Sequence, residues 1–257
     1  MGQDIFLPPC YGGDLVDTVK INTQGTAELI AHRGLSGLET ENTAAAFVAA
    51  GNRSYLGIET DIWRTADGKF ICIHDGRTGR LCGEDLVIED TPFDKLRGLV
   101  LRDTDGDYRN DLRLCTPSEY RKICERCGKV CVPELKSNFT LAEIEELFEI
   151  FDGYLDKTCF IAFSMENLKL VKQVRAEQNC QLLTGEYNDT LPSELAGRGM
   201  GVDIWHGALT RERIEIFHRA GVTVNCWTVD DPGRAQELIL WGVDQITTDI
   251  LEGGISD

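Results

Sequence analysis

Two histidines and three carboxylates of this sequence follow short apolar runs, at spacings that suit proton transfer beside a metal ion. His32 and His74 each end such a run, and imidazole, which titrates near neutral pH, can both accept and donate a proton. Glu59 and Asp61 stand two residues apart, so on a strand both side chains would point to the same face. Glu134 ends a later run of the same kind. Parallel strands would bring all five side chains to one edge.

Three carboxylates that meet at one place repel each other unless they are protonated or bridged by a cation. All-oxygen ligands select a hard cation, Mg²⁺ or Ca²⁺, over zinc. We therefore expect one divalent cation held by Glu59, Asp61 and Glu134. The alternative is a structural ion pair of Glu134 with Lys136 or Arg33, because ion pairs are common in proteins.

Two basic residues and one tryptophan accompany these groups. The formal net charge of −17 gives no general attraction for an anionic substrate, so local cations must hold it. Arg33 can pair with phosphoryl oxygens through two hydrogen bonds, and Lys136 adds a point charge. Trp227 ends another apolar run and can form an apolar wall for the substrate or part of the core. Two histidines, a metal ion and two cations together predict phosphoryl transfer.

The remaining two histidines are less informative. His206 ends an apolar run and can either contact substrate or fill a structural role, and His218 falls within an amphipathic segment, where a packing or surface role is expected. The nucleophile motif G-x-S-x-G of acyl-transfer enzymes is absent from the sequence.

Eight apolar runs, separated mostly by amphipathic segments, must position these residues. A strand–helix alternation of this kind indicates a parallel sheet, and eight units in about 250 residues favour a single-domain (β/α)₈ TIM barrel over an open doubly wound sheet. Thr140 and Glu143 form a capping box that predicts the start of one helix. The predicted strands are 29–32, 57–62 with a hairpin continuation at 69–74, 130–135, 160–163, 182–184, 202–205, 222–227 and 245–248.

Two segments lie outside this pattern. Residues 76–115 are charged, rich in glycine and aspartate and weakly periodic, so we expect a small insertion after the second strand, on the catalytic rim of the barrel. Residues 1–27 precede the first strand and are expected to form an N-terminal extension to a barrel of residues 28–257.

Composition narrows the function classes. The excess of acidic residues argues against a nucleic-acid partner, since such proteins neutralise phosphates with lysine and arginine. No run approaches the ~20 apolar residues that span a bilayer, and no secretory signal is visible, so we expect a cytoplasmic protein that acts on a small molecule without stable membrane insertion. The sequence predicts no oligomeric state.

Ten cysteines are best interpreted as reduced thiols. Cys124, Cys127 and Cys131, with Cys115 upstream, form the one candidate zinc site. Buried thiols on a helix and the strand that follows it are the favoured alternative, because zinc-finger spacing of further ligands is absent from the sequence.

The sequence resembles the glycerophosphodiester phosphodiesterase family in a series of motifs that run in order from residue 32 to residue 249. The resemblance therefore covers nearly the whole chain after the extension. The matching segments are His32-Arg33-Gly34, Glu41-Asn42-Thr43, Ile58-Glu59-Thr60-Asp61, Asp67-Gly68, Ile73-His74-Asp75, Pro133-Glu134-Leu135-Lys136, Cys226-Trp227-Thr228-Val229 and Thr248-Asp249.

This resemblance implies a (β/α)₈ barrel with an insertion after its second strand and hydrolysis of a glycerophosphodiester to sn-glycerol 3-phosphate and an alcohol. It implies His32 as the base and His74 as the acid, an order that the residues themselves leave open, as they leave open whether water or the substrate's 2-hydroxyl attacks. It places Arg33 on the phosphate, and Glu59, Asp61 and Glu134 on the metal. Thr40 stands where the family usually has proline, and Ile250 follows Asp249 where proline is common; we expect little effect of either on the chemistry.

Two other functions are considered. A related barrel phosphodiesterase for lysophospholipids or inositol phospholipids would need an exposed apolar rim, of which the acidic segment 76–115 offers little. A non-catalytic binding barrel would be expected to lack at least one of the two histidines and three carboxylates, yet all five are present.

Overall fold

The apolar runs form eight parallel strands that close into a barrel. The computed structural model describes residues 17–23 and 26–254. In the order in which they pair, the strands are β2 (Glu28–Ala31), β12 (Gln245–Thr248), β11 (Val224–Trp227), β10 (Gly201–Trp205), β9 (Cys180–Thr184), β8 (Phe160–Ala162), β7 (Val130–Leu135) and β3 (Gly57–Arg64). Ile30 pairs with Gly57, which joins β2 to β3 and closes the ring. The predicted (β/α)₈ barrel is therefore confirmed.

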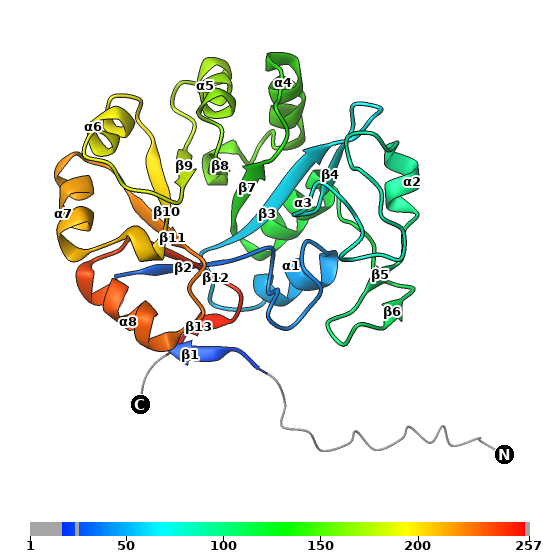
Figure 1. Ribbon diagram of the computed structural model, residues 1–257, viewed down its shortest axis with the longest axis horizontal. Helices are drawn as coiled ribbons and strands as arrows, with labels where there is room; N and C mark the ends of the chain where they lie inside the picture. The colour runs from blue at the N-terminus through cyan, green and yellow to red at the C-terminus, as the bar shows by residue number, and fades with distance from the viewer. Residues whose placement is uncertain (1–16, 24–25, 255–257) are drawn as a thin grey trace.

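Helices follow the strands and surround the barrel (Figure 1). They are α1 (Ala44–Gly51), α3 (Pro117–Cys127), α4 (Leu141–Ile150), α5 (Met165–Val174), α6 (Leu191–Ala196), α7 (Arg211–Arg219) and α8 (Pro232–Trp241). The predicted capping box of Thr140 and Glu143 begins α4, and Thr116 and Glu119 form a second one at α3. Helix α6 was not predicted, because its six residues are too few to show an amphipathic period.

The main hydrophobic core lies between the strands and the outer helices. Its largest fully buried side chains come from both kinds of element and include Phe47, Tyr120, Phe151, Phe160 and Phe217. A smaller buried cluster of Ile30, Val132, Ile161 and Leu183 comes from strands alone, as expected for side chains that fill the inside of a small barrel.

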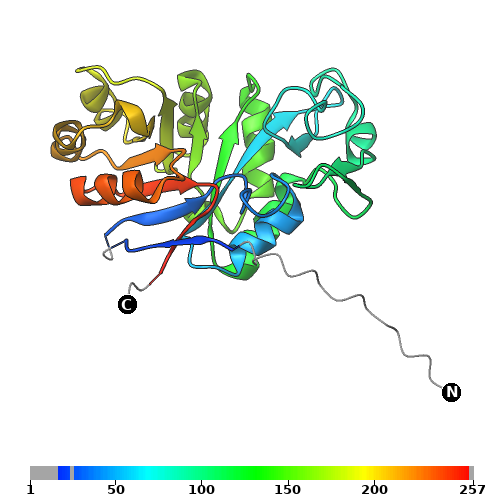
Figure 2. The ribbon, with the colours of Figure 1, turned by 60° about the horizontal axis from the view of Figure 1, so that its bottom comes forward.

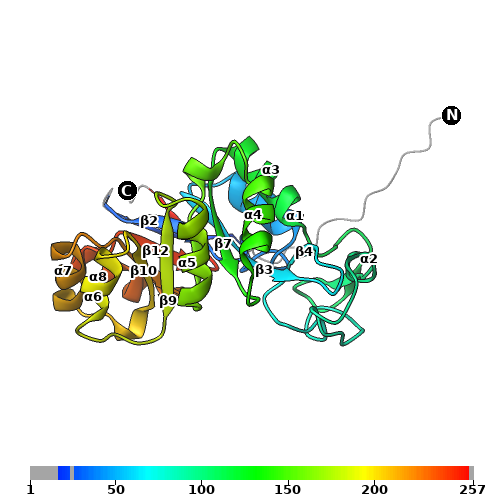
Figure 3. The same ribbon diagram turned by 90° about the horizontal axis from the view of Figure 1, so that it is seen from above.

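The insertion at 76–115 is folded around a hydrophobic cluster of its own. Strand β4 (Phe70–Cys72) pairs antiparallel with β3, as the hairpin interpretation predicted, and leads into the insertion. The insertion contains the short helix α2 (Phe93–Arg97) and the two-residue strands β5 (Leu101–Arg102) and β6 (Tyr108–Arg109). Figures 2 and 3 show it on the side of the barrel away from α7 and α8. The buried residues of this hydrophobic cluster that come from the insertion are Leu81, Cys82, Ile88, Leu96, Leu99, Leu101, Leu112 and Leu114. They pack with Ile71 and Ile73.

Part of the predicted N-terminal extension packs against the barrel. Strand β1 (Val19–Ile21) pairs in parallel with β13 (Leu251–Gly253), the segment that follows the last barrel strand. Lys20 forms an ion pair with Glu252, with 2.6 Å between Nζ and Oε2. Residues 1–16 of the extension lie outside the described residues. In the described part of the chain, none of the helices has the length and apolar character that crossing a membrane requires.

Candidate active site

The three predicted metal ligands meet at the carboxyl ends of two neighbouring strands. Glu59 and Asp61 lie on β3 and Glu134 lies on β7, where Asp61 and Glu134 are paired in the parallel register. Their candidate ligand atoms all lie within 4.8 Å of one another, and all three residues are buried. Parallel pairing therefore brings side chains 73 to 75 residues apart in sequence into one cluster.

The electrostatics of this carboxylate triad show that it cannot hold three negative charges alone. Burial and the charges of Asp61 and Glu134 raise the pKa of Glu59 well above its usual value. Burial and the charge of Asp61 raise the pKa of Glu134 to about 7. Burial would also raise the pKa of Asp61, but Lys136, Arg33 and other neighbours outweigh burial and hold it at about 2. The triad is therefore stable only with a bound proton or a cation.

The donor set fits a hard divalent cation. All ligand atoms are carboxylate oxygens, the type that Mg²⁺ and Ca²⁺ prefer. Asp61 Oδ1 is fully buried and accepts no hydrogen bond, although Lys136 Nζ lies 3.3 Å away in an ion pair. A buried carboxylate oxygen without a hydrogen bond is costly, and a coordinated cation would satisfy it.

A loop after β2 orients two of the three carboxylates of the triad. The backbone N–H of Arg33 donates to Glu59 Oε2 at 2.7 Å, and Asn42 Nδ2 donates to Asp61 Oδ2 at 2.8 Å. Arg33 and Asn42 both have left-handed φ angles, 54° and 55°. Such a conformation costs about 1–3 kcal/mol in a residue other than glycine, so the surrounding structure must hold it in place. Thr60 fixes the Asn42 amide by donating to its Oδ1 at 2.6 Å.

The sequence interpretation did not assign Asn42 a role. Asparagine tolerates a left-handed φ better than other non-glycine residues, and its amide can donate to one group while it accepts from another. Only its place in the motif Glu41-Asn42-Thr43 pointed to it, and that motif carried no assignment to the site.

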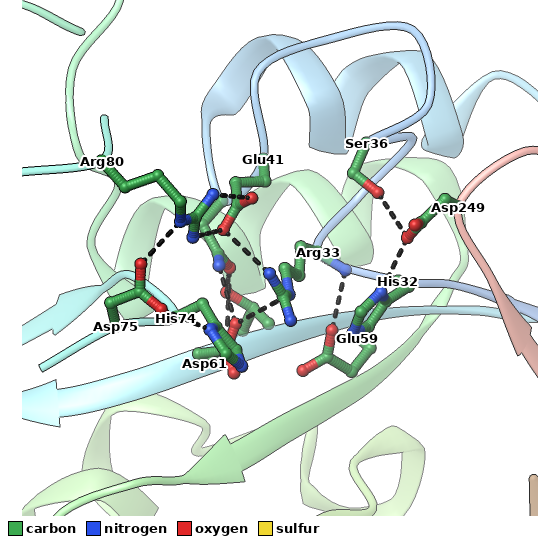
Figure 4. A network of polar contacts seen from close by, with 12 residues as sticks. His32, Arg33, Ser36, Glu41, Glu59, Asp61, His74, Asp75, Arg80 and Asp249 are labelled. Carbon is green, nitrogen blue, oxygen red and sulfur yellow. Dashed lines mark hydrogen bonds and ion pairs between the residues drawn. The ribbon is translucent and has the colours of Figure 1, made fainter. Parts of the chain in front are cut away.

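Each predicted catalytic histidine is paired with a carboxylate through Nδ1. His32 Nδ1 lies 2.7 Å from Asp249 Oδ1, which also accepts from the Ser36 hydroxyl at 2.8 Å. His74 Nδ1 lies 2.8 Å from Oδ1 of its neighbour Asp75. A carboxylate on Nδ1 fixes the ring and its tautomer, so that Nε2 is the nitrogen that faces a reacting group. Figure 4 shows the two rings on either side of Arg33.

The two predicted phosphate-binding cations also carry ion pairs. Lys136 Nζ lies 2.9 Å from Glu134 Oε1, so the ion pair considered from the sequence is present. Arg33 Nη1 donates to Glu41 Oε1 at 3.1 Å, and Arg33 Nε lies 3.6 Å from Asp61 Oδ2. Nearby carboxylates raise the pKa of both cations against the opposing effect of burial, so both stay charged.

Burial and the same two cations lower the pKa of one of the two histidines, His74. Burial, together with the charges of Arg33 and Lys136, lowers the pKa of His74 below 6.5. The carboxylates of Asp61 and Asp75 oppose this change without cancelling it. A protonated His74 in this environment gives up its proton more readily than a free imidazole does.

Three aromatic side chains lie at the carboxyl ends of β8, β10 and β11. Trp227 at the end of β11 is half-buried, donates from Nε1 to the Asp203 carbonyl at 3.1 Å and packs edge-on against Phe163 with 5.8 Å between ring centroids. Phe163 is 54% exposed and Trp205, at the end of β10, is 47% exposed. Both residues end predicted strands, but their exposure was not predicted, because a large apolar residue ordinarily indicates burial.

Other candidate residues have structural contacts. His206 Nδ1 accepts from Arg234 Nε at 3.2 Å, and His218 is exposed on α7, 2.9 Å from Asp244. Among the described residues, the carboxylate triad is the one group of three or more histidine, cysteine or acidic side chains arranged to hold a metal ion, so the zinc candidate at Cys124, Cys127 and Cys131 is not found there.

The chain is similar to known proteins in sequence and in fold. The sequence model of the glycerophosphoryl diester phosphodiesterase family matches residues 32–252. A glycerophosphodiester phosphodiesterase of Caldanaerobacter subterraneus is 28% identical over 239 residues, which cover 86% of this chain and 93% of that protein.

Two solved structures have the same fold. A glycerophosphodiester phosphodiesterase from Parabacteroides distasonis has a TM-score of 0.72 and 27% identity, with 87% of this chain and 93% of that chain covered. An Oleispira antarctica phosphodiesterase, solved in complex with the product sn-glycerol-3-phosphate, has a TM-score of 0.79 and 23% identity, with 88% and 94% covered.

Proposed function

The chain belongs to the glycerophosphoryl diester phosphodiesterase family and is a phosphoric diester hydrolase, and from this premise we propose how its residues carry the reaction. The substrate is a glycerophosphodiester, and the products are sn-glycerol 3-phosphate and an alcohol. His32 and His74 act as the acid–base pair, beside one divalent cation at the carboxylate triad. The observation that carries the proposal is the pair of histidines, each held through Nδ1 by a carboxylate, on either side of Arg33 (Figure 4).

The cation is Mg²⁺ or Ca²⁺, held by Glu59, Asp61 and Glu134. When bound, it neutralises negative charge on the phosphoryl oxygens. Arg33 and Lys136 bind the same oxygens from the two sides of the triad, and their charge is secured by the carboxylates that they contact. Trp227 lines the apolar wall beside the glycerol or the alcohol.

Proton transfer is divided between the two rings. His32 Nε2 accepts the proton of the attacking hydroxyl, and Asp249 stabilises the imidazolium that forms. If water attacks, sn-glycerol 3-phosphate forms directly; if the substrate's own glycerol hydroxyl attacks, the alcohol leaves and a cyclic phosphodiester forms, which water then opens to sn-glycerol 3-phosphate. His74 Nε2 donates a proton to the leaving alcohol oxygen. This order of the two rings follows the resemblance to the family, because both rings have the same kind of carboxylate contact.

A second substrate class has one observation in its favour. The exposed Phe163 and Trp205 supply the apolar rim that a barrel phosphodiesterase for lysophospholipids or inositol phospholipids would need, although they lie on the β8 and β10 side and not on the insertion. A lysophospholipid therefore belongs in the substrate panel. We further propose a cytoplasmic location, which suits the nine described cysteines, all of them free thiols.

A substrate panel tests the proposed function. Glycerophosphodiesters of choline, ethanolamine, glycerol and inositol, with lysophosphatidylcholine beside them, are incubated with the protein, and released sn-glycerol 3-phosphate and alcohol are measured. We expect release from at least one glycerophosphodiester, loss of turnover in excess chelator and recovery with Mg²⁺ or Ca²⁺.

Two variants accompany the panel. Glu59→Gln should lose the metal-dependent activity, whereas Glu145→Gln on the exposed face of α4 should retain it. Full activity in excess chelator would remove the cation from the mechanism, and absence of turnover on every diester would contradict the substrate class.

A further inference from the structure

Arg80 belongs to the insertion, yet its guanidinium reaches two carboxylates at the edge of the barrel mouth. Its Nε donates to Asp75 Oδ2 at 2.6 Å, and its two terminal nitrogens donate to the two oxygens of Glu41 at 2.7 and 2.8 Å. Three charge-assisted hydrogen bonds in a planar fork fix both carboxylates relative to each other. Figure 4 shows Arg80 above the site, between them.

Each of these carboxylates also contacts a residue of the candidate active site. Asp75 contacts His74 Nδ1 through its other oxygen, Oδ1, at 2.8 Å. Glu41 accepts from Arg33 Nη1 at 3.1 Å. The contacts therefore form a continuous chain from the phosphate-binding cation, through Glu41, Arg80 and Asp75, to the proposed acid.

The exposure of Arg80 suits a role in orienting the two carboxylates more than a role in stabilising the fold. The Arg80 side chain is 45% exposed, and exposed ion pairs contribute only about 0–1 kcal/mol to stability. The Glu41 side chain is 14% exposed, and the Arg80 hydrogen bond and the nearby cations outweigh burial to lower its pKa. The residues after Arg80, Leu81 and Cys82, are buried in the cluster of the insertion and fix the position from which Arg80 reaches the site.

We infer that Arg80 is a positioning residue for phosphodiester hydrolysis, which orients His74 through Asp75 and Arg33 through Glu41. The inference rests on the proposed function, and it gives the insertion a defined part in the reaction: it completes the support of one histidine and of the phosphate-binding arginine. Arg80 donates its hydrogen bonds to Asp75 and Glu41 and not to His74 or Arg33, so its effect passes through the two carboxylates.

Arg77 provides a matched control. It lies three residues before Arg80 in the same insertion, its side chain is 55% exposed, and its ion pair is with Asp85, which also belongs to the insertion. Arg77→Met therefore removes an exposed arginine and an ion pair of the same kind without touching the chain of contacts that leads to His74.

The kinetic test compares Arg80→Met, Arg80→Lys and Arg77→Met with the wild type, at saturating Mg²⁺ or Ca²⁺. We expect Arg80→Met to lower kcat/KM about tenfold to a hundredfold, with a lower kcat from the misplaced acid and a higher KM from the loosened Arg33. Arg80→Lys should recover part of the loss, because one ammonium group can reach one carboxylate but not both. Arg77→Met should match the wild type.

A double-mutant cycle separates positioning from a general structural effect. Since Arg80 acts on His74 through Asp75, Arg80→Met should lower kcat by much less in an Asp75→Asn background than in the wild type. Effects on kcat that simply multiply would overturn the inference, as would wild-type kinetics in Arg80→Met.

A spectroscopic measurement keeps the inference testable if the wild type turns over none of the substrates. Nitrogen-15 chemical shifts of His74 report which ring nitrogen carries the proton. In the wild type and in Arg77→Met the Nδ1–H tautomer should dominate, and in Arg80→Met the Nε2–H tautomer should gain population. An unchanged tautomer in Arg80→Met would overturn the inference independently of the proposed function.

Discussion

The two histidines of the site have the same local arrangement but are supported by different parts of the molecule. His32, Ser36 and Asp249, here called the His32 arm, are joined by hydrogen bonds across 217 and 213 positions of sequence. This arm forms because β12 pairs with β2, with Thr248 opposite Ala31.

His74, Asp75 and Arg80, here called the His74 arm, lie within seven consecutive residues. His74 and Asp75 are neighbours in the chain, and Arg80, which donates a hydrogen bond to Asp75, belongs to the insertion. One of the two proposed proton-transferring groups is therefore fixed by barrel closure itself, whereas the other depends on a segment added to the barrel.

The His32 arm is also held by the side chain of Asp230. Asp230 Oδ1 accepts from the Asp249 N–H at 2.8 Å and from the Thr248 hydroxyl at 2.8 Å. These bonds tie Asp249 and the end of β12 to the segment between β11 and α8. Changes in the insertion should therefore affect the His74 arm and leave the His32 arm intact.

Removal of either ring should give the largest effect and tests whether both arms take part in the reaction. We expect His32→Ala and His74→Ala each to lower kcat/KM by about 10²–10⁴-fold, the usual contribution of a general acid or base. His218→Ala, which removes an exposed ring on α7, should retain wild-type kinetics. Circular dichroism should show native structure in all three, and near-wild-type activity of either site variant would exclude that ring from proton transfer.

Substitution of the carboxylate that pairs with one histidine should shift only the limb of the kcat/KM pH profile that this histidine controls. Asp75 raises the pKa of His74 by hydrogen bonding, against burial, which lowers it below 6.5. Asp75→Asn should therefore lower this pKa further. Because the proposed acid must be protonated, the limb of the kcat/KM profile that falls with rising pH should move to lower pH.

Asp249→Asn serves as the matched variant for this profile, because it alters the carboxylate that pairs with His32. The limb that falls with rising pH, assigned to His74, should then stay in place. The loss of activity in Asp75→Asn should be smaller than in His74→Ala. Movement of the limb that falls with decreasing pH in Asp75→Asn would instead assign the base to His74.

A cavity in the insertion should have the smallest effect on activity. Leu96 of α2 is fully buried in the cluster of the insertion, and Leu96→Ala should lower the free energy of unfolding by about 2–5 kcal/mol, as measured by urea denaturation. We expect kcat/KM to fall by less than about tenfold, or ~1.4 kcal/mol, as Arg80 loses part of its support.

Leu168→Ala on α5 is the matched control for this change. Leu168 is equally buried but belongs to the main core, so it should lower stability by a similar amount with unchanged kcat/KM for the fraction that is folded. Equal kinetic effects of the two substitutions would mean that the insertion does not specifically support the His74 arm.

The strands and the carboxylate triad could be predicted because their signals are local. Each barrel strand is an apolar run, and its last residues face the site whatever the rest of the chain does. Glu59, Asp61 and Glu134 could therefore be placed together before their register was known. The same reasoning placed Asp249 at a strand end but did not pair it with His32, since that contact depends on the ring closing.

Contacts made by loops could not be predicted in this way. Asn42 and Arg80 lie in segments whose path is determined by turns and by packing of irregularly spaced leucines, so no periodic pattern indicates which way they point. The exposure of Phe163 and Trp205 was missed for a related reason: residue type predicts burial on average, but the mouth of a barrel is a surface.

The long separation between His32 and Asp249 has a consequence for the time at which the enzyme acquires its activity during synthesis. A ribosome that has released the chain only as far as α8 has already produced both histidines, all three carboxylates and Arg80, but not β12 or the partner of His32. Contacts of such high sequence separation form late, after the loop between them has been closed. In a nascent chain with most of its barrel in place, the His32 ring should therefore still lack its orienting partner, and turnover should begin only when the last barrel strand pairs with the first.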